Sequence, residues 1–180
     1  MNLDTLISSN AVIINSEIKS KKRALELLAE TLAEEAVHAN KAAAETSQQD
    51  DDTNTESTNT ENIKALGIFQ LLLDREKLGS TSMGHGVALP HARTALTEYA
   101  IGAFLKLDKG IDFDSPDNQP TDLIFALLVP EHYTDEHLKI LAYLASLFSD
   151  ESFCKSIRNT SSNTEIYHHL VNWQLTSQAS

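Results

Sequence analysis

One apolar run constrains the fold more than any other part of this sequence. After Asp122, residues 123–129 read LIFALLV without a polar residue, and Pro130 ends the run. A strand with one exposed face alternates apolar and polar residues, whereas a strand covered on both faces is apolar throughout. Because both faces of such a strand must be covered, the run predicts a sheet that lies between two layers of helices.

Three segments have the apolar periodicity of amphipathic helices: residues 20–37, 62–78 and 134–148. Ser20 and Thr134 stand where the first and third helices would begin, and both residue types are favoured N-caps. Apolar side chains recur at spacings of three and four, so each helix should turn one face toward the core. The expected core residues are Leu25, Leu28, Leu32 and Ala36, then Leu66, Phe69 and Leu73, then Leu138, Leu141, Ala145 and Phe148.

Residues 99–107 alternate in polarity and predict a half-buried strand. Two short helices are expected near residues 151–158 and 164–173. With a length of 180 residues, this order of helices, strands and helices predicts a single domain over residues 1–180, of the α/β class. The covered face of the alternating strand is expected to consist of Ile101, Ala103, Leu105 and Leu107.

Charge and composition exclude several partners. The net charge is −12, and neither nucleic acid nor an anionic membrane surface attracts an acidic chain. No apolar stretch is long enough to span a bilayer, so no membrane insertion is expected. Residues 1–28 lack a basic leader followed by an apolar block, which predicts no export signal. Cys154 is the only cysteine, which favours a reducing cytoplasm as the compartment.

Residues 38–61 differ from the rest of the chain in composition. Between Thr46 and Thr60 there is no apolar residue, no glycine and no proline. Such a tract cannot bury enough surface to offset the entropy of ordering it, so it predicts a polar, acidic, disordered insertion between the first two helices. Two interpretations stay open, an acidic docking arm or a surface loop that the fold tolerates.

The segment GHGVALPHAR, residues 84–93, places a histidine directly after a proline. Pro90 has no backbone N–H, so the strand should stop or reach a sheet edge there. His91 would then lie at the end of a rigid strand, where a partner could approach it. A neutral imidazole is a good nucleophile near neutral pH, which makes His91 a candidate phosphoryl acceptor. The alternative is an ordinary loop histidine.

Other chemistries find less support. A zinc site needs three or four ligands, and no HxxxH or CxxC pair occurs, so no metal is expected. The G-x-S-x-G elbow of serine hydrolases and the phosphate loop of nucleotide-binding proteins are also absent, and no cofactor is expected. Phosphoryl oxygens need cationic or N–H donors. Arg75, at the end of the second helix, and His137, in the first turn of its helix, are candidates for that role.

Residues 76–92 resemble the active-site signature of a known family. Glu76, Met83, Gly84 and the run Val87–Ala92 match, without a gap, the pattern of the IIA components of the phosphoenolpyruvate-dependent phosphotransferase system (PTS), of the fructose/mannitol type. Segments such as DREKLGST and IDFDSPDNQPTDLIFALLVPE are similar in particular to its nitrogen-regulatory branch. The resemblance covers most of the chain outside the polar insertion.

The resemblance implies a three-layer α/β/α sandwich around a mixed central sheet, and a phosphotransferase component that works through a phosphohistidine intermediate. His91 would accept a phosphoryl group from a small histidine phosphocarrier that resembles HPr. His137 would help hold that group, and Arg75 would stabilise its charge. The turn at Ser80 and Thr81 would pack beside the site. His85 departs from the pattern, and its ring could donate to the phosphate or simply face water.

Three functions remain open at this point. The first is a regulatory phosphocarrier of the nitrogen branch, whose partners would be an HPr-like protein and downstream target proteins. The second is the IIA component of a fructose or mannitol transporter, which passes the phosphoryl group to a separate IIB. The third is an interaction module that keeps the fold and is no longer phosphorylated.

Overall fold

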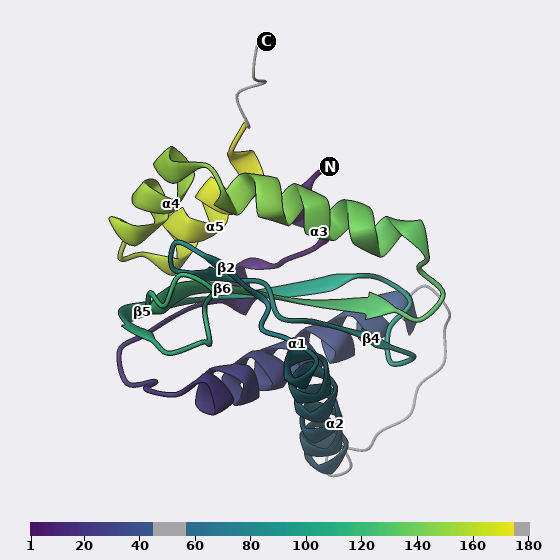
Figure 1. The fold of residues 1–180 in the computed structure, drawn as a ribbon. Helices are drawn as coiled ribbons and strands as arrows, with labels where there is room; N and C mark the ends of the chain where they lie inside the picture. The colour runs from purple at the N-terminus through teal and green to yellow at the C-terminus, as the bar shows by residue number, and fades with distance from the viewer. Residues whose placement is uncertain (45–56, 175–180) are drawn as a thin grey trace.

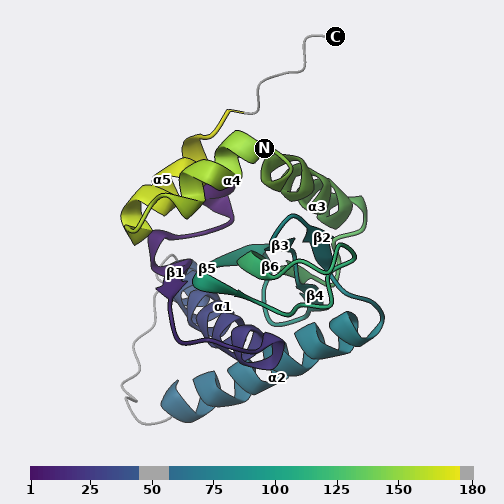
Figure 2. The ribbon, with the colours of Figure 1, turned by 60° about the vertical axis from the view of Figure 1, so that its left-hand side comes forward.

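The structure, a computed structural model, describes residues 1–44 and 57–174. Figures 1 and 2 show a central sheet with α1 and α2 on one face and α3, α4 and α5 on the other. The expectation of a sheet between two helical layers is therefore confirmed. The helices are α1 (Lys21–Ala44), α2 (Ser57–Lys77), α3 (Asp135–Phe148), α4 (Glu151–Arg158) and α5 (Asn163–Asn172), and two short 3-10 turns (Leu3–Thr5, Ser9–Ala11) precede them.

The sheet is mixed. Its order is β1-β5-β6-β3-β2, and β4 also pairs with β6. The strands β1, β3 and β4 run parallel to their neighbours β5 or β6, while the pairs β5–β6 and β2–β3 are antiparallel. The bounds are β1 (Val12–Asn15), β2 (Ser82–Gly84), β3 (Val87–Ala88), β4 (His91–Thr94), β5 (Ile101–Ile111) and β6 (Thr121–Pro130).

The two long strands form the middle of the core. Residues 123–130 of β6 are all buried, as the continuous apolar run predicts. Residues 101–107 of β5 are also buried at every position, so the prediction of a half-buried strand is wrong. Lys106 explains the error, because a polar residue in an alternating pattern suggested an exposed face. Its ammonium group instead donates to the backbone carbonyls of Arg158 and Thr160.

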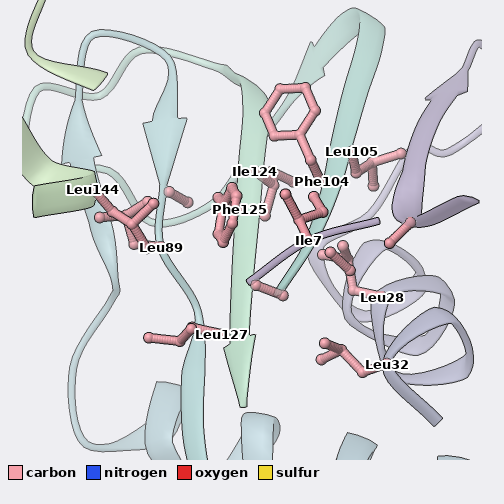
Figure 3. Packing of buried hydrophobic residues seen from close by; sticks show 14 of the residues in the cluster. Ile7, Leu28, Leu32, Leu89, Phe104, Leu105, Ile124, Phe125, Leu127 and Leu144 are labelled. Carbon is pink, nitrogen blue, oxygen red and sulfur yellow. The ribbon is translucent and has the colours of Figure 1, made fainter. Parts of the chain in front are cut away.

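The predicted core face is correct for α1 and partly wrong for α2 and α3. In α1 the expected stripe is buried, and Figure 3 shows Leu28 and Leu32 pointing toward the sheet. In α2 the prediction is wrong for Leu66, which is 69% exposed. In α3 it is wrong for Leu138, which is 58% exposed. The fully buried residues in these two helices include Ile68 and Leu72, and Ile140, Leu144, Leu147 and Phe148.

Both errors have the same cause. Apolar residues stand at consecutive positions in α2 and α3, so more than one stripe of spacing three and four can be drawn through them. Only the packing partner selects the face. Ser20 does cap α1, since its Oγ accepts from the N–H of Arg23 at 3.2 Å. Thr134 precedes α3 without a side-chain capping bond.

The ends of the expected insertion, residues 38–61, are helical. Residues 38–44 belong to α1, and α2 begins at Ser57. The run of alanines at positions 42–44 favours helix, which accounts for the longer α1. The remaining part of that prediction, residues 45–56, lies outside the described residues.

The proline at position 90 interrupts a strand rather than ending it. Both β3 and β4 pair with the same edge of β6, where Ala88 aligns with Ile124 and His91 with Leu127. Between these pairs, the N–H of Leu89 donates to the carbonyl of Thr81 at 3.1 Å. The break therefore places His91 at the first position of a new strand.

A pair of substitutions in α3 tests which face is buried. Leu144 is fully buried and Leu138 is 58% exposed. We expect Leu144→Ala to lower the free energy of unfolding by about 2–5 kcal/mol, because a cavity forms. Leu138→Ala should change it by less than about 0.5 kcal/mol. Urea unfolding followed by circular dichroism measures both. Equal losses would mean that α3 packs on a different face.

Candidate functional site

His91 is half-buried at the strand break, and one of its nitrogens has a fixed partner. Nδ1 of His91 lies 2.9 Å from the carbonyl oxygen of Leu89. A carbonyl oxygen can only accept, so the contact requires a proton on Nδ1. In the neutral ring the lone pair is then on Nε2. The contact with Leu89 therefore makes Nε2 the nitrogen that is able to react.

The surroundings of His91 keep its ring neutral. Burial lowers the pKa of His91 below its ordinary value of 6.5 and is the largest influence on it. The hydrogen bond to the Leu89 carbonyl and the negative charge of Glu76 act in the opposite direction, and the charges of Arg75 and His137 add to the lowering. A neutral imidazole at physiological pH has the lone pair that a nucleophile needs.

The structure brings both expected donors into this environment. Arg75 lies in the last turn of α2, a helix that packs against β4, and its Nη1 donates to the carbonyl of Gly79 at 3.1 Å. His137 lies in the first turn of α3. Among the described residues, none bonds to the buried Nδ1 of His137. A buried polar atom without a partner is uncommon and marks a position with unused hydrogen-bonding capacity.

The turn at Ser80 and Thr81 is bonded to the segment that precedes His91. Ser80 Oγ donates to the carbonyl of Phe113 at 2.7 Å. Thr81 donates from both N and Oγ1 to the carboxylate of Glu76, at 2.9 and 2.6 Å. Its carbonyl accepts from the N–H of Leu89. The turn is thus part of the scaffold of the site.

His85 lies apart from the site. It stands at the tip of the β2–β3 hairpin with φ of 55°, between Gly84 and Gly86. Its N–H donates to Asp117 at 2.8 Å, and its carbonyl accepts from Arg158 at 2.9 Å. His85 precedes the start of β3, and four strand positions of about 3.3 Å each separate Val87 from His91 along the edge of β6. Of the two alternatives left open for His85, this separation from His91 favours a ring that faces water.

Two residues that support the site, Glu76 and Arg93, were given no role by the sequence analysis. Glu76 entered only as the first residue of the signature, yet its carboxylate is buried beneath the site. Arg93 of β4 donates from Nη2 to the carbonyls of Glu131 and Tyr133, in the loop that leads to His137. In the sequence Glu76 stands among the charged residues of the run DREK, so its place in the signature is the signal that could have found it. The bonds of Arg93 to backbone carbonyls leave no such signal.

Within residues 1–44 and 57–174, no group of three His, Cys, Asp or Glu side chains is arranged to hold a metal ion. In the same part of the chain, no helix combines the length and the apolar character that a membrane span needs.

Fold and site together define a class of protein. It is a three-layer α/β domain that presents one neutral imidazole at a strand break, with a guanidinium and a second imidazole in its environment. That arrangement can accept a phosphoryl group. Residues 5–173 match the family model described as phosphoenolpyruvate-dependent sugar phosphotransferase system, EIIA 2, and the chain belongs to this family.

Relatives and solved structures agree with that family. The "Nitrogen regulatory protein" of Bradyrhizobium diazoefficiens is 36% identical over 171 residues, which cover 95% of both chains. The fructose-specific EIIA component of Haloferax volcanii is 34% identical over 100 residues, 56% of this chain and 65% of its own. The crystal structure of nitrogen regulatory protein IIA-Ntr from Neisseria meningitidis has a TM-score of 0.70 at 36% identity, and covers 92% of this chain and 96% of its own.

The mannitol IIA of Escherichia coli extends the likeness at the level of the fold. Its crystal structure has a TM-score of 0.62 at 18% identity, over 90% of this chain and 96% of its own. At that identity the agreement concerns the arrangement of layers and strands. The mixed sheet between two helical layers is therefore shared by the regulatory and the mannitol proteins.

The pKa of His91 gives a direct test of the site. Because its pKa is lowered, the ring should lose its charge at a lower pH than a free histidine does. We expect an NMR titration of the imidazole nitrogens to show a midpoint below 6.5 and, in the neutral form, a proton on Nδ1. A midpoint above 6.5 would contradict the dominance of burial over the other influences. A proton on Nε2 in the neutral form would contradict the contact with Leu89. His85, for comparison, lies outside this environment.

Proposed function

We propose that this protein is a phosphohistidine carrier of the nitrogen-regulatory branch of the PTS, with His91 as its acceptor. The observation that supports this most is the hydrogen bond from His91 Nδ1 to the Leu89 carbonyl. It leaves Nε2 free and oriented. The single cysteine and the acidic composition agree with action in the cytoplasm.

The transfer needs one bond to form and one to break. The lone pair on Nε2 of His91 attacks the phosphorus of a phosphohistidine on an HPr-like carrier, and the P–N bond of the donor breaks. The donor imidazole leaves with the electron pair of that bond. The proton on Nδ1 of His91 stays in place, and the ring gains positive charge that the Leu89 carbonyl oxygen stabilises. No proton has to leave His91 during the step.

Arg75 and His137 are proposed to receive the phosphoryl oxygens. Charge develops on these oxygens in the transition state, and donors held in place beforehand stabilise it. The Nδ1 of His137 has no partner among the residues that the structure describes, which supports this role, because a phosphoryl oxygen would give that buried nitrogen a partner. Arg75 contributes a guanidinium, whose planar set of N–H donors matches the geometry of phosphoryl oxygens.

The regulatory role is favoured over sugar transport by the extent of the similarity. The relative named nitrogen regulatory protein matches 95% of this chain, whereas the fructose-specific relative matches 56%. Phosphorylation would add about −1.5 to −2 charges at one spot and so change which target proteins bind there. A sugar-uptake assay with a separate IIB distinguishes the two roles, since the regulatory protein should not support uptake.

Phosphoryl uptake tests the acceptor. The protein is incubated with phosphoenolpyruvate, enzyme I and an HPr-type carrier, and its intact mass is measured. The wild type should gain one acid-labile phosphoryl group and His91→Ala none. His85→Ala should match the wild type, since His85 lies apart from the site. Uptake by His91→Ala would refute the assignment. A wild type that stays unmodified would favour the interaction module.

The donor role of His137 predicts a change in rate. We expect His137→Ala to take up the phosphoryl group about a hundredfold more slowly than the wild type, because one hydrogen-bond donor to the transition state is lost. Rapid-quench measurement of the phosphorylated fraction gives this rate. The imidazole of His91 should keep its tautomer in this variant. A wild-type rate would remove His137 from the site.

A further inference from the structure

We propose that Glu76, with Lys21 as its counter-ion, positions the ring of His91 through the turn at Thr81. The inference rests on the proposed function, because it concerns the same phosphoryl site. Glu76 and Lys21 would act as positioning residues that do not touch the phosphoryl group. Three contacts connect the carboxylate to the ring: Glu76 with Thr81, Thr81 with Leu89, and Leu89 with His91.

The carboxylate of Glu76 is buried and fully engaged. Its side chain is 3% exposed, at the end of α2. Removing a carboxylate from water is costly unless it is paired and hydrogen-bonded. Oε1 lies 2.9 Å from Nζ of Lys21 and accepts from the N–H of Thr81, and Oε2 accepts from Thr81 Oγ1 at 2.6 Å. Such a pair fixes the backbone and the side chain of Thr81 together.

Thr81 is linked to the reactive ring by two further hydrogen bonds. Its carbonyl accepts from the N–H of Leu89 at 3.1 Å, and the carbonyl of Leu89 lies 2.9 Å from Nδ1 of His91. Leu89 lies between the stretches of β3 and β4 that pair with β6. Its N–H is thus held by the turn, so the position of the turn determines where the acceptor for His91 lies.

Lys21 holds this arrangement from the other helix of the same layer. Its Nζ also lies 3.0 Å from Asp114 and 4.8 Å from the centre of the Phe113 ring. Burial lowers the pKa of Lys21, but the bonds to Glu76 and Asp114 raise it by more than burial lowers it. The pKa therefore lies above its ordinary value, and the group stays charged. A phosphoryl group adds negative charge near Glu76. The charge of Lys21 offsets that of the carboxylate and so limits the repulsion.

Three variants and one control test the proposal in the full-length protein. Glu76→Gln keeps the shape and removes the charge, Thr81→Val removes only the bond to Oε2, and Lys21→Met removes the counter-ion. Asp74→Asn is the control, because Asp74 is an exposed carboxylate on the same helix. Each is assayed for the rate of uptake from the phosphorylated HPr-type carrier, and for the tautomer of His91 by nitrogen NMR.

We expect Glu76→Gln and Thr81→Val to lose about tenfold to a hundredfold in rate, because small displacements of a reacting group are costly. Lys21→Met should be slowed in the same direction. In all three the neutral His91 ring should no longer hold its proton on Nδ1 alone. Asp74→Asn should keep the wild-type rate and tautomer.

The outcomes separate a positioning role from a merely structural one. If the rate falls only in proportion to the folded fraction, and the tautomer of the folded protein is unchanged, the proposal is overturned. Wild-type rates in Thr81→Val and Lys21→Met would overturn it as well, even if Glu76→Gln fails to fold. If the wild type itself takes up no phosphoryl group, the proposed function fails. The tautomer measurement, which needs no phosphoryl donor, still tests the positioning.

Discussion

The interruption between β3 and β4 is the constraint on which the rest of the site depends. The carbonyls of Gly86 and Pro90 accept from β6, so the backbone groups of Leu89, one position off this alternation, face away from that strand. They bond within the site instead: the N–H of Leu89 donates to Thr81, and its carbonyl accepts from the ring of His91. The pairing then resumes, with the N–H of Leu127 donating to the carbonyl of Pro90 at 2.9 Å. The break is thereby flanked on both sides by residues that pair with β6.

The helical layers meet at this break from opposite faces of the sheet. The end of α2 contributes Arg75 and Glu76, and the start of α3 contributes His137. Arg93 links the start of α3 to the sheet, since it donates to backbone carbonyls in the loop before that helix. The site is thus built where two layers and the broken strand meet. Rigid elements position each group, which favours accurate geometry over loops alone.

The sequence predicts those parts of this arrangement that a short stretch of residues determines, and it does not predict those that tertiary packing determines. The layers follow from one apolar run, because residues 123–129 cannot have an exposed face. His91 follows from the proline before it and from the ungapped signature. The buried faces of α2 and α3 cannot be predicted from the sequence. Leu66 and Leu138, which are exposed, fit a helical stripe no worse than the residues that are buried. His85 lies within the span of the signature, at a position that does not match it. The hairpin tip holds it at a positive φ, a tertiary feature that Asp117 and Arg158 stabilise.

Charge explains how an acidic chain can work with phosphate. The net charge is −12, but charges on the surface are screened beyond about 8–10 Å at physiological salt. In the proposed site, what a phosphoryl group would meet is therefore set by Arg75 and His137, and by whether Glu76 is neutralised by Lys21. The same screening restricts what a partner can sense. On the proposed function, a change of about −1.5 to −2 charges at His91 would act on groups placed over the site and on few others, so a target would have to dock there to read the phosphorylation state.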